Sequence, residues 1–251
     1  MTIKAVCFIP GEANSPHPDE YACQFPAMIN DWRTKFSVAS KGQTNKQFPF
    51  GFVQLAANVN RTLHVGFPDL RWSQTAKYGY VPNPLLPNVF MAVAMDLPDF
   101  DSPFGTIHPR DKQDVAVRLA LAGRGVAYGE NSLDFQGPFP SNFQTNNHTM
   151  TIEFDHGTSA IDVRSNDDFE VCCTHAANYS SCQRWEWKPA PVIGHDQSSV
   201  TIDTHACIGY RPVLNSVRYA WEVTPCFVKQ CGIYDQNTDL PAPPFIKHGP
   251  F

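Results

Sequence analysis

The stretch VFMAVAMDLPDFDSPFGTIHPRDKQDVAVRLALAGRGVAY, residues 89–128, decides how the first half of this chain folds. It begins with seven apolar residues, a length that fits one buried strand. A polar loop follows, and residues 109–128 then carry a helix-like pattern with Pro109 at its first position. The stretch therefore predicts a strand, a loop and a helix, with His108 on the loop directly before the helix.

Upstream segments repeat this alternation of apolar runs and amphipathic stretches. The predicted elements are strands over 3–9 and 48–56 and helices over 20–36 and 69–78, the last with Asp69 as N-cap. Strands that alternate with helices are typical of a parallel sheet covered by helices. Ligands bind such sheets beyond the carboxyl ends of the strands. We therefore expect Gly11 and His108 to lie at one edge of the sheet.

After Gly129 the helical spacing disappears, and short alternating runs are separated by Gly, Pro, Asn and Asp. This pattern predicts an antiparallel β domain. Strands are expected over 149–154, 160–163, 169–173, 184–187, 199–202 and 217–221. The fold class is therefore α/β, with a parallel sheet and flanking helices over 1–135 and a β-rich domain over 136–251.

The composition narrows the class of partner. The chain has 251 residues and a formal net charge of −5, without a dense run of Lys and Arg. Nucleic-acid binding normally shows a basic face, so no nucleic-acid partner is expected. No apolar run approaches the roughly 20 residues that cross a bilayer, so no membrane span is expected either.

The eight cysteines point to an oxidising compartment, since six of them follow residue 170. Their spacing does not give two Cys-x-x-Cys knuckles, so disulfides are favoured over zinc. The pairing stays open, although Cys226 and Cys231 could close a small loop by themselves. Three Asn-x-Ser/Thr sequons, at Asn60, Asn147 and Asn178, also favour a secreted or lysosomal protein. The first residues lack the pattern of a signal peptide, so we expect the targeting segment to lie elsewhere.

His108 is the strongest candidate for chemistry. A histidine between a buried strand and a helix is held rigidly and can still face solvent, as a general base in acyl transfer requires. No plausible serine or cysteine nucleophile precedes it, and Ser159 is predicted to be a turn residue. The other histidines, among them His175, His195 and His205, are predicted to be surface or structural residues.

Several of these stretches together resemble one family, the sialate O-acetylesterases, which are serine hydrolases of the SGNH type. The resemblance lies in CQFPAMINDWR (23–33), FPFGFVQL (48–55), RWSQT (71–75), YGYVPNP (78–84), MAVAMDL (91–97) and SPFGTIHPRDKQ (102–113), and later in RYAW (218–221) and LPAPPFI (240–246). It implies hydrolysis of O-acetyl esters on sialic acids, chiefly 9-O-acetyl esters, through a serine acyl-enzyme without metal or cofactor. The family's nucleophile lies in a Gly-x-Ser-like segment upstream of these motifs, and we expect this chain to lack it.

The resemblance assigns His108 as the base that takes the serine proton and returns it to the leaving alcohol. The usual pattern places an Asp three residues before this His, where this chain has Gly105. Asp101 is the candidate orienting acid. Asp96, Asp99 or a backbone carbonyl in a Ser-His dyad are the alternatives.

Gly11-Glu12-Ala13-Asn14 is similar to the family's Gly-Glu-x-Asn segment, in which Gly11 and Asn14 would donate to the oxyanion. The family usually has Gln before this Gly. Pro10 stands there instead, which puts oxyanion stabilisation in doubt, and an ordinary turn is the alternative. Arg71 and Gln74 share a helix face, and the family places this pair near the active-site mouth. Arg71 either binds the sialate carboxylate as a fork or pins a loop.

The sequence thus predicts part of a sialate O-acetylesterase acting by a Ser-His(-Asp) mechanism, inactive as this chain alone. The expected partner is an O-acetylated sialic acid or sialoglycan, and neither metal nor cofactor is required. A non-catalytic glycan-binding homologue is the first alternative, because of Pro10 and Gly105. A structural module, in which the sheet half merely supports the β domain, is the second.

Overall fold

The computed structural model describes residues 2–59, 66–174, 182–207 and 213–251. The chain divides into two compact units. The first comprises 1–136 and 222–228, and the second comprises 137–221 and 229–251. The segment 222–228 was predicted to lie in the β-rich domain over 136–251, but it belongs to the first unit.

The first unit is built on a parallel sheet in the order β1-β2-β3, formed by Val6–Phe8, Phe50–Gln54 and Val89–Val93. All five residues of β2 and of β3 are buried, as expected for strands covered on both faces. The strands are shorter than the predicted runs, because after β2 and β3 apolar residues continue past the strand into the core. Met95 and Leu97 are examples, at 0% and 1% exposed.

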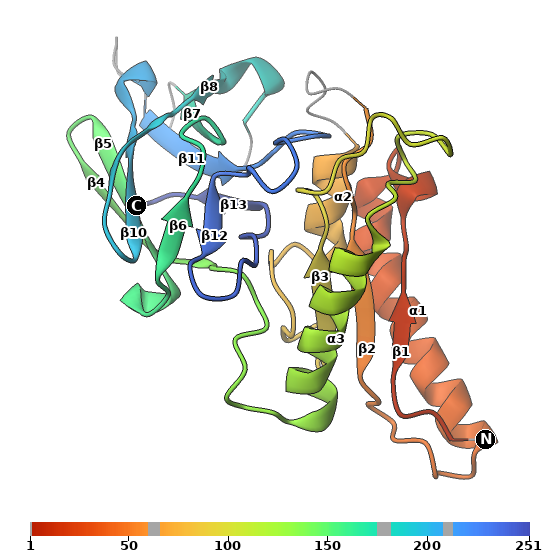
Figure 1. The fold of residues 1–251 in the computed structure, drawn as a ribbon. Coiled ribbons are helices and arrows are strands. Elements are labelled where there is room, and N and C mark those ends of the chain that lie inside the picture. Colours follow the sequence, from red (N-terminus) through yellow and green to blue (C-terminus); the bar gives the residue numbers. More distant parts are fainter. Residues whose placement is uncertain (1, 60–65, 175–181, 208–212) are drawn as a thin grey trace. The chain divides into compact units, whose positions relative to one another are not determined.

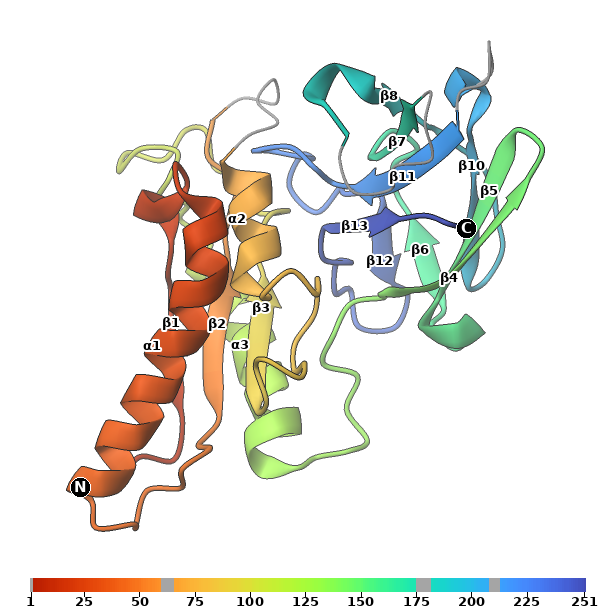
Figure 2. The same ribbon diagram turned by 180° about the vertical axis from the view of Figure 1, so that it is seen from behind.

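Helices cover the two faces of this sheet (Figure 1, Figure 2). Helices α1 (Pro18–Ala39) and α2 (Phe67–Gln74) lie on one face, and α3 (Lys112–Tyr128) lies on the other. On the α1 side, the ring of Phe25 meets those of Phe50 and Phe52 edge-on. On the α3 side, Val115 packs in a cluster with Val53, Ala94 and Leu97. The predicted alternation of strands and helices is therefore present, and its three strands form a parallel sheet.

The starts of two helices differ from expectation. Helix α3 begins at Lys112 and not at Pro109, because the Asp111 carboxylate caps it by accepting from the Asp114 amide at 3.0 Å. Helix α2 has Gly66 as N-cap, and Asp69 sits one turn in, where its carboxylate accepts from the Gly66 amide at 3.0 Å. Asp69 thus closes a capping arrangement from the helix side.

A buried ion pair joins α3 to the end of β3. Arg118 donates to both carboxylate oxygens of Asp96, at 2.6 and 2.8 Å, and to the Val93 carbonyl at 2.8 Å. The side chain of Asp96 is 0% exposed and that of Arg118 is 7% exposed. Because a buried charge is tolerated only when it is paired, this interaction fixes the position of the loop that follows β3.

The second unit holds two four-stranded antiparallel sheets, in the orders β4-β5-β10-β9 and β13-β11-β7-β8, and a two-stranded sheet of β12 and β6. The rings of Phe169, Tyr219 and Phe245 pack in its core, with Tyr219 stacked on Phe245 and tilted to Phe169. The strands are Pro140–Asn146, Thr149–Phe154, Ile161–Val163, Phe169–Thr174, Trp187–Pro189, Val192–His195, Ser199–Asp203, Val213–Tyr219, Ile233–Asp235 and Phe245–His248, numbered β4 to β13 in order. Four short 3-10 turns accompany the fold, η1 (Glu12–Asn14), η2 (Asp155–Gly157), η3 (Arg184–Glu186) and η4 (His205–Cys207).

The disulfides confirm the preference for cystine over zinc in the second half. Cys172 bonds to Cys182, and Cys173 bonds to Cys207. Cys226 and Cys231 are disulfide-bonded as well. The remaining cysteines, Cys7 and Cys23, are free and exposed.

Candidate active site

The loop that carries His108 is closed at its base by Asp99 and Arg110. The guanidinium donates to both carboxylate oxygens, at 2.7 and 2.8 Å, and the Arg110 amide donates to the same carboxylate at 2.9 Å. These hydrogen bonds lower the pKa of Asp99 to about 2. The two residues lie eleven positions apart in the sequence, so this pair closes the loop between them.

Inside this loop, the backbone of His108 is fixed on both sides. Its amide donates to the Gly105 carbonyl at 2.9 Å, and its carbonyl accepts from the Ser102 hydroxyl at 2.7 Å. Gly105 has a φ of 88°, a left-handed conformation that favours glycine. Gly105 therefore has a backbone role at the position where the usual SGNH pattern has Asp.

The His108 side chain is exposed, and among the described residues its imidazole has no hydrogen-bond partner. Asp101 is exposed too, and the described contacts include no bond between its carboxylate and the ring. Asp96 and Asp99 are occupied by Arg118 and Arg110. The orienting acid thus stays a prediction, and Asp101 is the candidate whose carboxylate is not held in an ion pair.

The turn at 10–14 follows β1 and forms the short helical turn Glu12–Asn14. Gly11 has a φ of 110°, and a Cβ on it would lie 3.2 Å from the Leu70 side chain, so glycine is required twice over. Asn14 is half-buried, and within the described residues its side-chain amide has no hydrogen-bond partner. This amide is free to donate to a ligand, which is what an oxyanion role needs.

Arg71 and Gln74 are both fully buried. The Arg71 guanidinium donates to four backbone carbonyls at 2.7–3.0 Å, those of Leu55, Ala56, Glu222 and Val223. Burial lowers the pKa of Arg71 to about 9, which still leaves it charged at neutral pH. Of its two expected roles, the structure shows Arg71 pinning loops, with its donors already engaged.

Gln74 joins the carboxyl ends of β1 and β2. Its side-chain nitrogen donates to the carbonyls of Pro10 and Val53, both at 3.1 Å, and its oxygen accepts from the Leu55 amide at 3.0 Å. Gln74 therefore lies beneath the turn that presents Gly11. It supports the shape of the site from below and is not open to a ligand.

A pocket joins the two halves of the candidate site. Its lining includes Ile9 and Glu12 from the turn after β1, and Ile107 and Pro109, the residues on either side of His108. The floor is apolar, and the full lining is Ile9, Glu12, Val53, Leu55, Ala56, Ala94, Leu97, Ile107, Pro109, Lys112 and Val115. The expected convergence of these two segments at the sheet edge is therefore present. Glu12 and Lys112 carry charge at this pocket; both lie in family-like motifs, but the sequence assigned neither a role.

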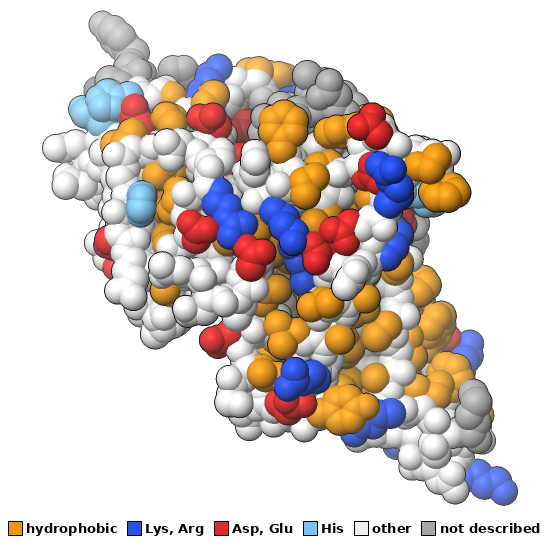
Figure 3. All heavy atoms as spheres, in the orientation of Figure 1, with side chains coloured by type: hydrophobic (Ala, Val, Ile, Leu, Met, Phe, Trp, Pro, Cys, Tyr) orange, Lys and Arg blue, Asp and Glu red, His pale blue; other side chains and the backbone are white. Residues whose placement is uncertain are grey.

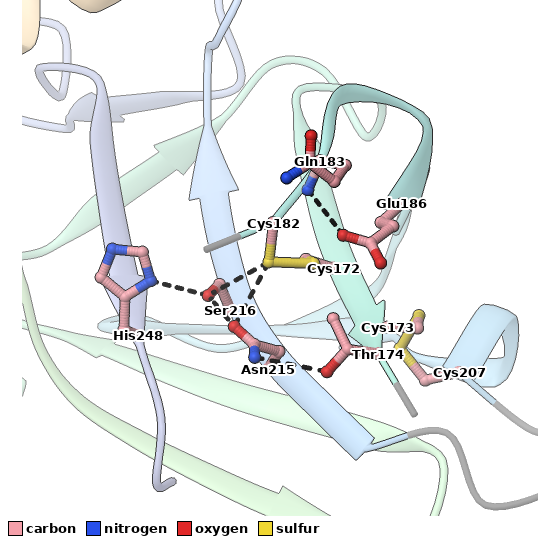
Figure 4. The surroundings of a disulfide bond; sticks show 10 residues. All are labelled: Cys172, Cys173, Thr174, Cys182, Gln183, Glu186, Cys207, Asn215, Ser216 and His248. Atoms are coloured by element: carbon pink, nitrogen blue, oxygen red, sulfur yellow. Dashed lines mark hydrogen bonds between the residues drawn. A yellow bond between two sulfur atoms is a disulfide. The ribbon is translucent and has the colours of Figure 1, made fainter. Parts of the chain in front are cut away.

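A serine–histidine pair lies in the second unit, where the Ser216 hydroxyl and the Nδ1 of His248 are 2.7 Å apart (Figure 4). Ser216 is 0% exposed and its hydroxyl is also bonded to the Asn215 side chain at 2.7 Å. A nucleophile must reach its substrate, so this pair is structural. Ser159 is bonded to the Asp155 carboxylate. Neither serine is therefore a candidate nucleophile.

The sequence predicts that His195 and His205 are surface or structural residues. His195 and His205 are exposed, and His205 bonds to Asp203 at 2.6 Å. His175, Asn60 and Asn178 lie outside the described residues. Asn147 is exposed at the turn between β4 and β5.

Figure 3 shows Lys and Arg side chains interspersed with Asp and Glu on the face in view. Over the ranges that the structure describes, no helix is long and apolar enough to cross a membrane. The same ranges contain no group of three or more His, Cys, Asp or Glu residues that could hold a metal ion.

Comparison with known proteins identifies relatives over almost the whole chain. Residues 141–249 match the sialate O-acetylesterase C-terminal domain. The sialate O-acetylesterases of Mus musculus and Homo sapiens are each 46% identical over 250 residues, 98% of this chain. A carbohydrate acetylesterase from Xanthomonas citri has a similar fold, with a TM-score of 0.72 and 30% identity over 98% of this chain and 50% of that one.

The chain spans only 44% of the length of the mouse relative and 46% of the human one. Over 98% of its length the chain is similar to the sialate O-acetylesterases, and residues 141–249 match that family's C-terminal domain.

Proposed function

We propose that this chain supplies the general base of a sialate O-acetylesterase, which hydrolyses O-acetyl esters, chiefly at the 9-position, of sialic acids. The observation that carries the proposal is the placement of His108. Its backbone is locked by Ser102 and Gly105, its ring is exposed, and its flanking residues line a pocket with Glu12. A base must combine a fixed position with access to the substrate.

The reaction that we propose needs a serine hydroxyl from outside these 251 residues. His108 would take its proton as the oxygen attacks the acetyl carbonyl, and would return that proton to the sugar hydroxyl that leaves. The Gly11 amide and the Asn14 side chain would donate to the developing oxyanion. We propose Asp101 as the orienting acid, because its carboxylate is exposed on the same loop and, among the described residues, is not held in an ion pair. The three parallel strands would then be part of a larger SGNH-type sheet.

The lengths of the relatives support a nucleophile from elsewhere, since they are about twice as long as this chain. The proposal predicts no esterase turnover by residues 1–251 alone. It also predicts turnover when these residues replace the corresponding 44% of the mouse relative in a chimera. Release of acetate from a 9-O-acetylated sialic acid measures both.

A chimera that folds and does not turn over would favour the glycan-binding alternative, for which Pro10 and Gly105 are the departures from the family pattern. Turnover of the same substrate by the isolated chain would contradict the proposal from the other side, because it would place a nucleophile within these residues.

We also propose a secreted or lysosomal location, which is supported by the disulfides in the second unit. In that setting Asn147 would carry an N-linked glycan. Its position at an exposed hairpin turn leaves room for one. Glycosidase treatment should release one glycan fewer from Asn147→Gln than from the parent chain, as measured by mass spectrometry, and equal mass shifts of the two would contradict it.

A further inference from the structure

We propose that residues Arg184–Lys188 of the second unit form a binding surface for a carboxylated glycan, with the indole of Trp185 as the stacking platform. The segment consists of η3 (Arg184–Glu186) and the start of β8. It has no place in the proposed esterase chemistry, and the choice of a sialic acid as its ligand rests on the proposed function.

The first observation is an indole that the fold leaves in solvent. Trp185 is 72% exposed, while the core aromatic residues of the same unit, Phe169, Tyr219 and Phe245, are at most 1% exposed. Trp187 is half-buried, and its ring covers the guanidinium of Arg218 at 4.1 Å. The fold has therefore used one indole for packing and left its neighbour free to contact a ligand.

The second observation is that the segment is held rigidly. The Cys172–Cys182 disulfide precedes it, and the Gln183 amide donates to the Glu186 carboxylate at 2.6 Å (Figure 4). On its other side, Trp187 pairs with Cys172 in the sheet. An aromatic ring on a rigid support loses little conformational entropy on binding, which favours a recognition role.

The third observation is unbalanced positive charge beside the ring. Arg184 and Lys188 are exposed, and within the described residues neither side chain has an ion-pair or hydrogen-bond partner. The nearby acid, Glu186, is occupied in capping. By contrast, Arg164 is paired with Asp162 and Asp239, and Arg218 with Glu170. The segment therefore offers two free cations.

Together these features fit a sugar that carries a carboxylate. The apolar face of a sugar ring stacks on an indole, and a carboxylate is a natural acceptor for a guanidinium or an ammonium. A protein partner is less consistent with a single exposed ring in a charged rim, because a stable interface buries on the order of 1,000 Å² or more. We therefore commit to a sialoside.

Titration of the complete chain with 3′-sialyllactose, followed by NMR chemical shifts of the indole N–H groups, tests the proposal. Lactose is the matched ligand without the carboxylate. We expect sialyllactose to shift the Trp185 signal, and lactose to bind at least about tenfold more weakly. Trp185→Ala and the pair Arg184→Gln with Lys188→Gln should each weaken binding about tenfold or more. Because these side chains are exposed, the variants keep the fold, which their remaining spectrum verifies.

His108→Ala separates this proposal from the esterase proposal. Binding that is lost in Trp185→Ala and kept in His108→Ala supports the second-unit surface. Binding that is kept in Trp185→Ala and lost in His108→Ala would place the sugar in the first unit and overturn this inference alone. Absence of any shift with sialyllactose, equal binding of lactose, or a Trp185-dependent dimer in sedimentation would each overturn it as well.

Discussion

The side-chain nitrogen of Gln74 donates to the carbonyl of Pro10 at 3.1 Å, and this bond sets the position of the turn that presents Gly11. The same side chain also bonds to Val53 and Leu55, so it joins the ends of β1 and β2. The motif around Arg71 and Gln74 thus supports the site by holding the backbone around it in place. The consequences can be measured on the isolated chain.

Replacing Gln74 by Leu should destabilise the first unit by about 3 kcal/mol, because buried backbone groups lose their partners. Urea unfolding followed by fluorescence measures the loss. Gln24→Leu is the matched control, since Gln24 is exposed on α1 and should change stability by less than about 0.5 kcal/mol. Equal effects of the two substitutions would mean that the Gln74 bonds carry no stability.

Replacing Arg118 by Met should cost about 3–5 kcal/mol, since it leaves the Asp96 carboxylate buried without its ion-pair partner. Adding Asp96→Leu to that variant should recover part of the loss, because no charge then stays buried. Arg124→Met, which removes the surface pair with Glu130, should cost less than about 1 kcal/mol. A double variant that is no more stable than Arg118→Met would show that the buried charge is not the cause.

The pairing of Asp99 with Arg110 predicts how the His108 loop responds to acid. Because the pKa of Asp99 is lowered to about 2 from an ordinary 3.8, the pair contributes stability at pH values above 3.8. That contribution is lost as the pH falls through 2. A carboxyl NMR titration of Arg110→Gln should show the pKa of Asp99 returning toward 3.8. An unchanged pKa in that variant would rule out Arg110 as the cause.

His248 also predicts a loss of stability in acid, at a milder pH than the Asp99 pair does. Burial, with a smaller effect of Lys247, lowers the pKa of His248 below 6.5, so the unfolded chain binds the proton more readily. Stability of the second unit should therefore fall as the pH drops below about 6.5. Urea midpoints at pH 7.5 and pH 5 measure this, and His248→Asn should reduce the difference. The exposed His195→Asn is the control, and an equal reduction there would contradict the assignment.

The sequence was sufficient to predict the elements whose apolar periodicity is strong. The three parallel strands, helix α1 and the convergence of the 9–12 and 107–109 segments all followed from apolar runs and their order. The family motifs added His108 as the base, a role that stays a proposal.

Other features could not be read from local patterns. The choice between carboxylate binding and loop pinning stayed open for Arg71, because a sequence does not show that four carbonyls converge on one guanidinium. The start of α3 was misplaced because the Asp111 side chain, and not Pro109, caps it. The strands β9, β12 and β13 were missed because they are only three or four residues long. The strand β4 was missed because most of its residues are polar and give no apolar alternation.

The most direct test of the esterase account is His108→Ala in the chimera with the mouse relative, assayed as kcat/KM on a 9-O-acetylated sialic acid. The account predicts a loss of about 10²-fold or more, with an unchanged unfolding transition. Turnover of the His108→Ala chimera within a few-fold of its parent would contradict it.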